Sequence, residues 1–377
     1  MKKKICFVVA TPMTAKAFLL EHMEALSEFY QISLVANFQG EDFDPQVAGG
    51  VTIFNVPIAR EISLSADFVA LIKLYRLFRA EQFDAVHSVT PKAGLLAMLA
   101  SKAVGITNRF HTFTGQVWAT KTGLFRTILM FLDKVIYACA SNVLVDSPSQ
   151  RDFLLSHGVI QKNGSTVLGD GSISGVDVVR FKPDAEKRLL VRKNHGIPED
   201  GFVFLFLGRL NREKGIAELL QAFARLDFVA DNAYLLVVGP DEDGVLSGYD
   251  ELVQKFGQHF IRVGFTKEPE MYMASADIFC LPSYREGFGT VILEAAASGV
   301  PALGSDIYGV SDAIADGNTG LLHEKGNVDD LFSKMKYLIE NKEFVAEMGL
   351  NAHKRVHELF TSARVVQEMV NFYRDQV

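Results

Sequence analysis

Residues 281–301 read LPSYREGFGTVILEAAASGVP, which is an apolar strand end, a glycine-flanked turn and a helical pattern in succession. A strand followed by a helix predicts one unit of a parallel α/β sheet. Glu286 and Glu294 stand eight residues apart, so a helix that begins near Gly287 would project both carboxylates toward the same side. Open α/β sheets bind ligands beyond the carboxyl ends of their strands, which is where Leu281 leads. We therefore expect the two acids to face an elongated polar ligand; the alternative is a solvent-facing helix start with ordinary acids.

Short β-branched runs alternate with longer helical patterns on both sides of this stretch. The alternation occurs twice along the chain and predicts an α/β fold with two parallel sheets, each covered by helices. The expected strands lie near 5–10, 32–36, 51–56, 85–89, 110–113, 142–145 and 165–168, and then near 202–207, 234–238, 260–263, 278–281 and 302–303. Among the expected helices are 16–29, 215–225, 328–341, 344–360 and 362–375.

The polar stretch 177–187, which carries Pro183, separates the two series of strands and is the expected domain boundary. The prediction is a first domain over 1–180 and a second over 181–358. The amphipathic segment 359–377 has no strand after it, so we expect it to form a helix that packs back on the first domain.

The composition is that of a folded protein, with 377 residues of which 49% are hydrophobic. No apolar run reaches the length of a membrane-spanning helix, and no cleavable signal follows the basic start, so we expect a cytoplasmic protein. Three cysteines in apolar segments suit reduced core thiols, and no Cys/His cluster has zinc-ligand spacing.

The net charge of −7 hides an uneven distribution. Residues 1–180 hold 17 Lys and Arg against 15 Asp and Glu, or +2, and the remainder holds 21 against 30, or −9. An acidic chain is a poor nucleic-acid binder. The positive charge of the first half clusters in two apolar stretches, which suit either peripheral contact with an anionic membrane or helices packed on the sheet. Those charges are Arg60, Lys73, Arg76 and Arg79 in one stretch, and Arg109, Lys121, Arg126 and Lys134 in the other.

A basic loop, Gly208-Arg-Leu-Asn-Arg-Glu-Lys-Gly215, lies between a predicted strand and a predicted helix. Helix N-terminal N–H groups together with the charges of Arg209 and Lys214 would suit a diphosphate. The order of residues is not that of a Walker A loop. The alternative is a surface loop with ordinary charges.

Several other enzyme classes lack their signatures. The glycine-rich segment 169–175 lacks G-x-G-x-x-G spacing, and no glycine follows the first strand, so a nicotinamide-dependent oxidoreductase is not expected. No G-x-S-x-G nucleophile elbow is present. His87 and His111 fall at the ends of predicted strands, where an isolated histidine is structural more often than catalytic.

Taken together, these motifs resemble the retaining glycosyltransferases of family four. The resemblance rests on the basic loop, Val263-Gly264-Phe265, and Pro282-Ser283 running into the Glu286/Glu294 pair. In the first half, segments 87–94 (HSVTPKAG) and 112–115 (TFTG) resemble more loosely the bacterial branch that builds lipid-linked surface polysaccharides. The resemblance implies a GT-B fold, in which an N-terminal Rossmann-like acceptor domain and a C-terminal Rossmann-like donor domain face a cleft.

The same resemblance implies roles for individual residues. Arg209 and Lys214 would hold the donor diphosphate, Glu286 would accept hydrogen bonds from the donor sugar, and Glu294 would take the ribose hydroxyls. Glu286, Lys214 and Arg209 are thus the implied catalytic residues. The implied donor contacts are Gly208, Arg209, Lys214, Val263, Gly264, Phe265, Ser283, Glu286, Gly287, Phe288, Gly289 and Glu294, with the backbone of 263–265 meeting the base. Such enzymes need no metal, since cationic side chains and helix dipoles neutralise the leaving diphosphate.

The acceptor side departs from the family's pattern at two places. Many relatives carry histidine where Thr114 stands, and paired glycines where this chain has residues 11–14. The acceptor-side candidates are therefore less defined; they are Thr14, His87, Lys92, His111 and Thr114.

We accordingly predict an enzyme that moves a sugar from a nucleotide-sugar donor, most simply UDP-linked, to a lipid-linked glycan in capsule or O-antigen synthesis. It would work at the inner face of the cell membrane, in peripheral contact with anionic lipid. The alternatives are a glycosyltransferase with a soluble sugar acceptor and a GT-B-type sugar-nucleotide epimerase. The epimerase would need catalytic acids on the first domain, where no convincing set occurs.

Overall fold

The computed structural model describes residues 2–39, 50–59 and 63–377, and its chain forms two compact units. Unit 1 comprises residues 1–174 together with 362–377, and unit 2 comprises 175–361. The chain thus passes from unit 1 to unit 2 between Ser174 and Gly175, a few residues before the expected boundary, and returns between Thr361 and Ser362. The predicted Arg60 of the first basic stretch lies outside the described residues.

Unit 1 is built on a parallel sheet of seven strands in the order β3-β2-β1-β4-β5-β6-β7. Its strands are β1 (Lys4–Val8), β2 (Gln31–Ala36), β3 (Thr52–Asn55), β4 (Ala85–Val89), β5 (Asn108–Phe113), β6 (Asn142–Val145) and β7 (Thr166–Val167). Its helices are α1 (Pro12–Phe18), α2 (Leu20–Ser27), α3 (Leu64–Glu81), α4 (Pro91–Val104), α5 (Gly123–Cys139), α6 (Pro148–Ser156) and α15 (Ser362–Gln376).

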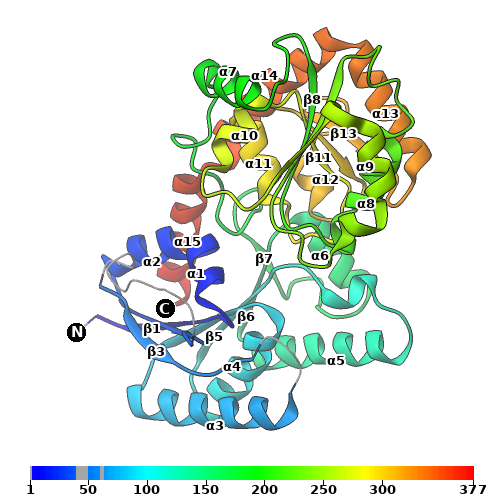
Figure 1. The fold of residues 1–377 in the computed structure, drawn as a ribbon. Helices are drawn as coiled ribbons and strands as arrows, with labels where there is room; N and C mark the ends of the chain where they lie inside the picture. The colour runs from blue at the N-terminus through cyan, green and yellow to red at the C-terminus, as the bar shows by residue number, and fades with distance from the viewer. Residues whose placement is uncertain (1, 40–49, 60–62) are drawn as a thin grey trace. The chain divides into compact units, whose positions relative to one another are not determined.

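Alternate residues of the central strands of unit 1 supply two cores, one on each face of the sheet. On β1, Cys6 and Val8 belong to a core shared with α3, α4 and α5, whereas Ile5 and Phe7 belong to one shared with α1, α2 and α15. Because both faces are covered, β1 is apolar from Ile5 to Val8 instead of at every second position. Figure 1 shows the two helical layers on opposite sides of the sheet.

The C-terminal helix α15 packs within unit 1. The Tyr373 hydroxyl lies 2.7 Å from Nδ1 of His87, in the middle of the sheet, and Phe372 meets Phe110 edge-on with ring centroids 5.1 Å apart. These contacts join the last residues of the chain to β4 and β5.

Unit 2 repeats the pattern with six parallel strands in the order β10-β9-β8-β11-β12-β13. Its strands are β8 (Phe202–Leu207), β9 (Ala233–Val238), β10 (Phe260–Val263), β11 (Ile278–Leu281), β12 (Ala302–Ser305) and β13 (Gly320–His323). Its helices are α7 (Ala185–Asn194), α8 (Ile216–Phe223), α9 (Asp250–Phe256), α10 (Pro269–Ser275), α11 (Thr290–Ala297), α12 (Val310–Ala313), α13 (Val328–Glu340) and α14 (Lys342–Leu359).

Three sequence-based expectations differ from the structure. The helix expected over 16–29 is two helices, because the backbone of Leu19 departs from helical geometry (φ −121°, ψ −11°) between α1 and α2. Strand β13 was not expected, since only two of its four residues, Leu321 and Leu322, are apolar. The helix expected to begin near Gly287 begins at Thr290.

Candidate functional site

Two loops of unit 2 meet at the carboxyl ends of neighbouring strands. Strand β8 lies between β9 and β11, so the strand order reverses there, which is the position where open α/β sheets bind ligands. The loop after β8 contains Gly215 at φ +70°, and a Cβ on this glycine would lie 1.9 Å from the carbonyl oxygen of Pro282, in the loop after β11. The Tyr284 amide also donates to the Glu213 carbonyl oxygen at 2.8 Å. A glycine at 215 is therefore what allows the two loops to touch.

The contact between the loops brings Lys214 to Glu286. Nζ of Lys214 donates to Oε1 of Glu286 at 2.6 Å, and the side chains are only 22% and 12% exposed. Lys214 ends a short 3-10 helix (Arg212–Lys214), and the side chain of Asn211 caps it by accepting from the Lys214 amide at 3.1 Å. The basic loop and the first acid thus form one charged pair at the reversal point.

The helix expected to begin near Gly287 begins three residues later. Helix α11 begins at Thr290, and its N-cap, Gly289, takes φ +74°, a left-handed conformation that ends the preceding loop. Glu286 therefore belongs to the loop, whereas Glu294 lies in the second turn of the helix. The two carboxylates reach the site from different local structures.

The turn from Gly287 to Gly289 presents backbone instead of side chains. Phe288 is buried in the core of unit 2 and packs against Phe360 at 5.4 Å between ring centroids. Gly289 has no side chain to cap α11, so the first amides of the helix keep their capacity to donate to an anion. A Cβ on Gly309 would lie 2.3 Å from the Gly287 carbonyl oxygen, so the loop after β12 packs closely against the backbone of this turn.

Arg209 follows Gly208 directly at the end of β8, and its guanidinium Nη1 lies 3.1 Å from Oε2 of Glu242. Both side chains are between two-fifths and half exposed. The structure therefore pairs the two predicted diphosphate residues with different acids, Arg209 with Glu242 and Lys214 with Glu286.

Glu294 has an unusual environment for a carboxylate. Burial raises its pKa to about 7, the positive charge of Arg180 opposes this shift, and the negative charge of Glu270 adds to it. Arg180 and Glu270 pair with each other at 2.9 Å. Near neutral pH this carboxyl group divides between its protonated and ionised forms.

Residues 263–265 continue from β10 at the same edge of the sheet. Phe265 is 73% exposed, whereas the Val263 carbonyl oxygen accepts from the Gly239 amide at 3.1 Å. Arg262, which the sequence analysis did not select, donates to the carbonyl oxygens of Val237, Val263 and Gly239 and so links the ends of β9 and β10. The sequence feature that could have pointed to Arg262 is that it is a charged residue within an otherwise apolar predicted strand.

Ser283 is completely buried, and no partner of its hydroxyl oxygen occurs among the described residues. Beside it, Tyr284 donates to Glu218 at 2.7 Å and Arg285 pairs with Glu213 at 2.7 Å. The sequence analysis missed these two pairs. Their charges lie in or next to the two selected loops, but nothing along the chain indicates which of them pair.

The acceptor-side candidates of unit 1 separate into two groups. Thr14 and Thr114 are half-buried in α1 and just after β5, respectively. His87 and His111 are wholly buried within β4 and β5, and burial lowers the pKa of both to about 3, so both imidazoles are neutral. Neither histidine is exposed, and an acceptor contact by either of them stays a prediction.

The remaining acceptor-side candidate, Lys92, lies in the first turn of α4. Its ammonium group is 2.7 Å from Oδ1 of Asp67 on α3, and both side chains are mostly buried. The pair joins the start of α4 to α3.

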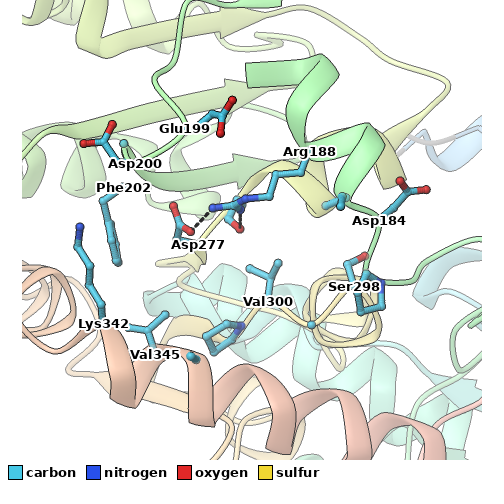
Figure 2. Close-up of a pocket in the computed structure, with 18 residues that line it drawn as sticks. Asp184, Arg188, Glu199, Asp200, Phe202, Asp277, Ser298, Val300, Lys342 and Val345 are labelled. Atoms are coloured by element: carbon cyan, nitrogen blue, oxygen red, sulfur yellow. Dashed lines mark hydrogen bonds and ion pairs between the residues drawn. The ribbon is translucent and has the colours of Figure 1, made fainter. Parts of the chain in front are cut away.

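A cavity of about 430 Å³ in unit 2 lies at the opposite, amino-terminal edge of the sheet. Figure 2 shows Arg188 reaching across it to Asp277, with Phe202, Val300 and Lys342 around it. Oδ1 of Asp277 accepts from Arg188 at 2.7 Å, and no predicted site residue lines the cavity. It is therefore separate from the loops described above. Among the described residues, no group of three or more His, Cys, Asp and Glu is placed to hold a metal ion.

Both halves of the chain match known protein families. Residues 187–355 match the model described as glycosyl transferases group 1, and residues 15–168 match the glycosyl transferase 4-like domain. The chain is 31% identical over 319 residues to the capsular polysaccharide biosynthesis glycosyltransferase CapM of Staphylococcus aureus, covering 84% of this chain and 83% of the relative. It is 24% identical over 384 residues to an Escherichia coli UDP-Gal:α-D-GlcNAc-diphosphoundecaprenol α-1,3-galactosyltransferase, covering 100% and 98%.

Solved structures with the same fold include the sucrose-phosphate synthase of Thermosynechococcus elongatus, with a TM-score of 0.82, 20% identity and 99% coverage of both chains. Another is HepE of Anabaena in complex with UDP and glucose, with a TM-score of 0.80, 18% identity and 99% coverage of both chains. These likenesses concern the fold alone.

Proposed function

This chain belongs to the group 1 glycosyltransferases, and from that membership we propose that it transfers a sugar from a nucleotide-sugar donor to a lipid-linked glycan. The family, family four, consists of retaining enzymes, and the two units of this chain are the halves of its GT-B fold. The observation that carries the proposal is the Lys214–Glu286 pair at the point where the strand order of unit 2 reverses.

The donor half of the proposal follows from the charges in unit 2. Lys214 and Arg209 supply positive charge for the donor diphosphate, and the first amides of α11 supply donors to its oxygens. Glu286 has an acceptor oxygen beside Lys214, where it can receive hydrogen bonds from hydroxyl groups of the donor sugar. Glu294, further along α11, is the candidate for the ribose hydroxyls. We propose that the base of the donor nucleotide is uracil.

The chemical step that these groups support is a same-face displacement. The acceptor hydroxyl attacks the anomeric carbon on the face from which the diphosphate leaves, and the departing phosphate oxygen takes the hydroxyl proton. Negative charge grows on the diphosphate as the bond to the sugar breaks, and Lys214 and Arg209 are placed to stabilise it. We propose that these cationic groups do so without a metal ion.

The acceptor half of the proposal draws on the relatives. One relative acts in capsular polysaccharide synthesis, and the name of another specifies a sugar on diphosphoundecaprenol. We infer that this chain extends a lipid-linked intermediate of a surface polysaccharide, as a hexosyl- or N-acetylhexosaminyltransferase.

An apolar face of helix α5 supports peripheral membrane contact in unit 1. Leu124, Phe125, Ile128 and Phe131 follow helical spacing and are all exposed, and positive charge lies on the same segment. The helix is held in place from the other side, where the Trp118 indole donates to Asp133 at 2.7 Å. No helix of the described residues is long and apolar enough to cross a membrane. We propose that this face docks on anionic lipid at the inner surface of the cell membrane.

Vesicle sedimentation tests the docking. The protein should sediment with anionic vesicles at low salt and be released as salt rises, since each basic residue near the surface contributes roughly 1 kcal/mol. Replacing Lys121, Arg126 and Lys134 with Gln should weaken sedimentation and leave nucleotide affinity unchanged. If the wild type ignores anionic vesicles at every salt concentration, the docking proposal fails and a soluble acceptor becomes the better reading.

Transfer itself is tested with a panel of UDP- and GDP-sugars and of sugars on polyprenyl diphosphate, with products identified by mass and their anomeric configuration by NMR. We expect one donor to be used and its configuration to be retained. Transfer to free sugars but to no lipid-linked acceptor would overturn the acceptor assignment, and an inverted product would overturn the mechanism.

A further inference from the structure

A buried polar cluster lies at the carboxyl ends of β5, β6 and β7 in unit 1, on the same strand edge as the acceptor-side candidate Thr114. At its centre is Asp146, the first residue after β6, which is 4% exposed. Its backbone amide donates to Oε1 of Gln150 at 2.7 Å, and its carbonyl oxygen accepts from the amide of Ser172 at 2.7 Å. The main chain of Asp146 is thus fully bonded.

The side chain of Asp146 is not. Its Oδ1 atom is buried and has no hydrogen-bond partner among the described residues. Burial raises the pKa of this carboxyl group to about 8, and no neighbouring positive charge opposes the shift. A buried polar atom without a partner costs stability, so folding alone gives no reason for an acid at this position. Carboxyl groups whose pKa is raised by burial in this way cluster at functional sites.

The surrounding loops are built to hold this carboxyl group in place. Nε2 of Gln150 donates to the Phe113 carbonyl oxygen at 3.2 Å, which joins the first turn of α6 to the end of β5. Phe113 and Val145 are register partners at the ends of these strands, so Thr114 and Asp146 follow as the next residues along the same edge.

The glycine-rich segment 169–175, which fitted no dinucleotide site, is the third segment that contacts the cluster around Asp146. Ser172 takes φ +73°, a left-handed conformation that is uncommon for a residue with a side chain, and its amide is the one that bonds to Asp146. Gly171, at φ +111°, precedes it. Backbone strain at Ser172 therefore accompanies the placement of the loop against Asp146.

We propose that Asp146 is a binding residue for the acceptor sugar, and that its carboxyl group forms a hydrogen bond with a hydroxyl or acetamido group of that sugar. The inference rests on the proposed function, which needs an acceptor site outside the donor loops of unit 2. The chemistry favours a neutral group, since an anion such as the acceptor diphosphate would meet a carboxyl group with no compensating cation.

The test compares Asp146→Ala, Asp146→Asn and the control Asp152→Asn, which removes an exposed acid one turn into α6. We expect Asp146→Ala to raise the KM for the glycan acceptor roughly ten- to hundredfold, the effect of one lost hydrogen bond in a dry site. Asp146→Asn keeps a hydrogen-bonding amide and should stay within about threefold of the wild type. The donor KM and the slow hydrolysis of donor without acceptor should be unchanged in every variant, and Tm should not fall.

Two results would overturn the inference. One is an unchanged acceptor KM in Asp146→Ala. The other is a parallel loss of donor hydrolysis, acceptor transfer and Tm in both Asp146 variants, which would mean that the carboxyl group only supports the loops, for instance through a buried water. Failure of the wild type to use any glycan acceptor would refute the proposed function, an outcome read from the wild type alone and so distinct from both.

Discussion

Replacing Glu286 with Gln should separate donor binding from turnover, because the carboxylate is paired with Lys214 before any ligand arrives. The two atoms lie 2.6 Å apart and both side chains are largely shielded from water. A nucleoside diphosphate must compete with Glu286 for the ammonium group. Glutamine has nearly the same shape but carries no charge, so the substitution releases Lys214 without opening a cavity.

The magnitude follows from the bond that is lost. A hydrogen bond to a charged group contributes about 1.5–3 kcal/mol net, and an ammonium group has three donors, so Lys214 keeps part of its contact with Glu286 when it binds phosphate. Competition of about 1–1.5 kcal/mol remains. Glu286→Gln should therefore bind a nucleoside diphosphate roughly five- to tenfold more tightly. Turnover should fall about a hundredfold or more, since the charge is lost where it would hold the donor sugar.

Titration calorimetry with the diphosphate and with the bare nucleoside measures the first effect, and initial rates measure the second. Lys214→Ala should show the opposite binding effect, a ten- to hundredfold loss of diphosphate affinity with nucleoside binding unchanged. Glu340→Gln is a matched control, because it breaks an exposed ion pair between Glu340 and Lys336 in the last turn of α13. It should alter neither diphosphate affinity nor turnover. Wild-type diphosphate affinity in Glu286→Gln would refute the competition, and wild-type turnover would remove Glu286 from the site.

Three further predictions concern the same donor unit. Arg209→Ala should weaken diphosphate affinity only about three- to tenfold by calorimetry, less than the loss at Lys214, because an exposed charge paired with Glu242 is well screened; a loss as large as that of Lys214→Ala would contradict this ranking. Donor affinity should rise up to roughly tenfold between pH 6 and pH 8. The reason is that Glu294, with a pKa of about 7, must release its proton before its carboxylate can accept hydrogen bonds from the ribose hydroxyls. The variant Glu294→Gln should bind donor independently of pH over this range. Rates measured with excess EDTA should equal those without it; complete loss of activity would show that a metal ion carries the diphosphate charge.

Much of the fold could be read from short stretches of the chain. The strands β4, β6, β8, β10 and β11 have the bounds predicted from their short runs of mostly apolar residues, since a strand covered on both faces is apolar over most of its length. The helix break at Leu19 and strand β13 were not predicted. Neither changes the local hydrophobic period enough to be visible.

The candidate site likewise has features that the sequence predicted and features that only the tertiary structure decided. The residue types and their order predicted that the loops after β8 and β11 carry the charges of a donor site, because neighbouring parallel strands end at one edge of a sheet. Only the tertiary structure decided that Lys214 pairs with Glu286, 72 residues away, and Arg209 with Glu242. It also decided that His87 is buried in the core. The sequence could not show this, because a core residue and a site residue can both stand near the end of a strand.

The raised pKa of Asp146 and the partial protonation of Glu294 belong to this second class. Secondary structure depends on the hydrophobic pattern of residues a few positions apart, which the sequence displays directly. The charge state of a carboxyl group depends on how much water and which charges surround it, and these neighbours come from loops far apart in the chain. Their approach is set by the packing of the sheets and by glycines such as Gly215, which permit backbones to touch.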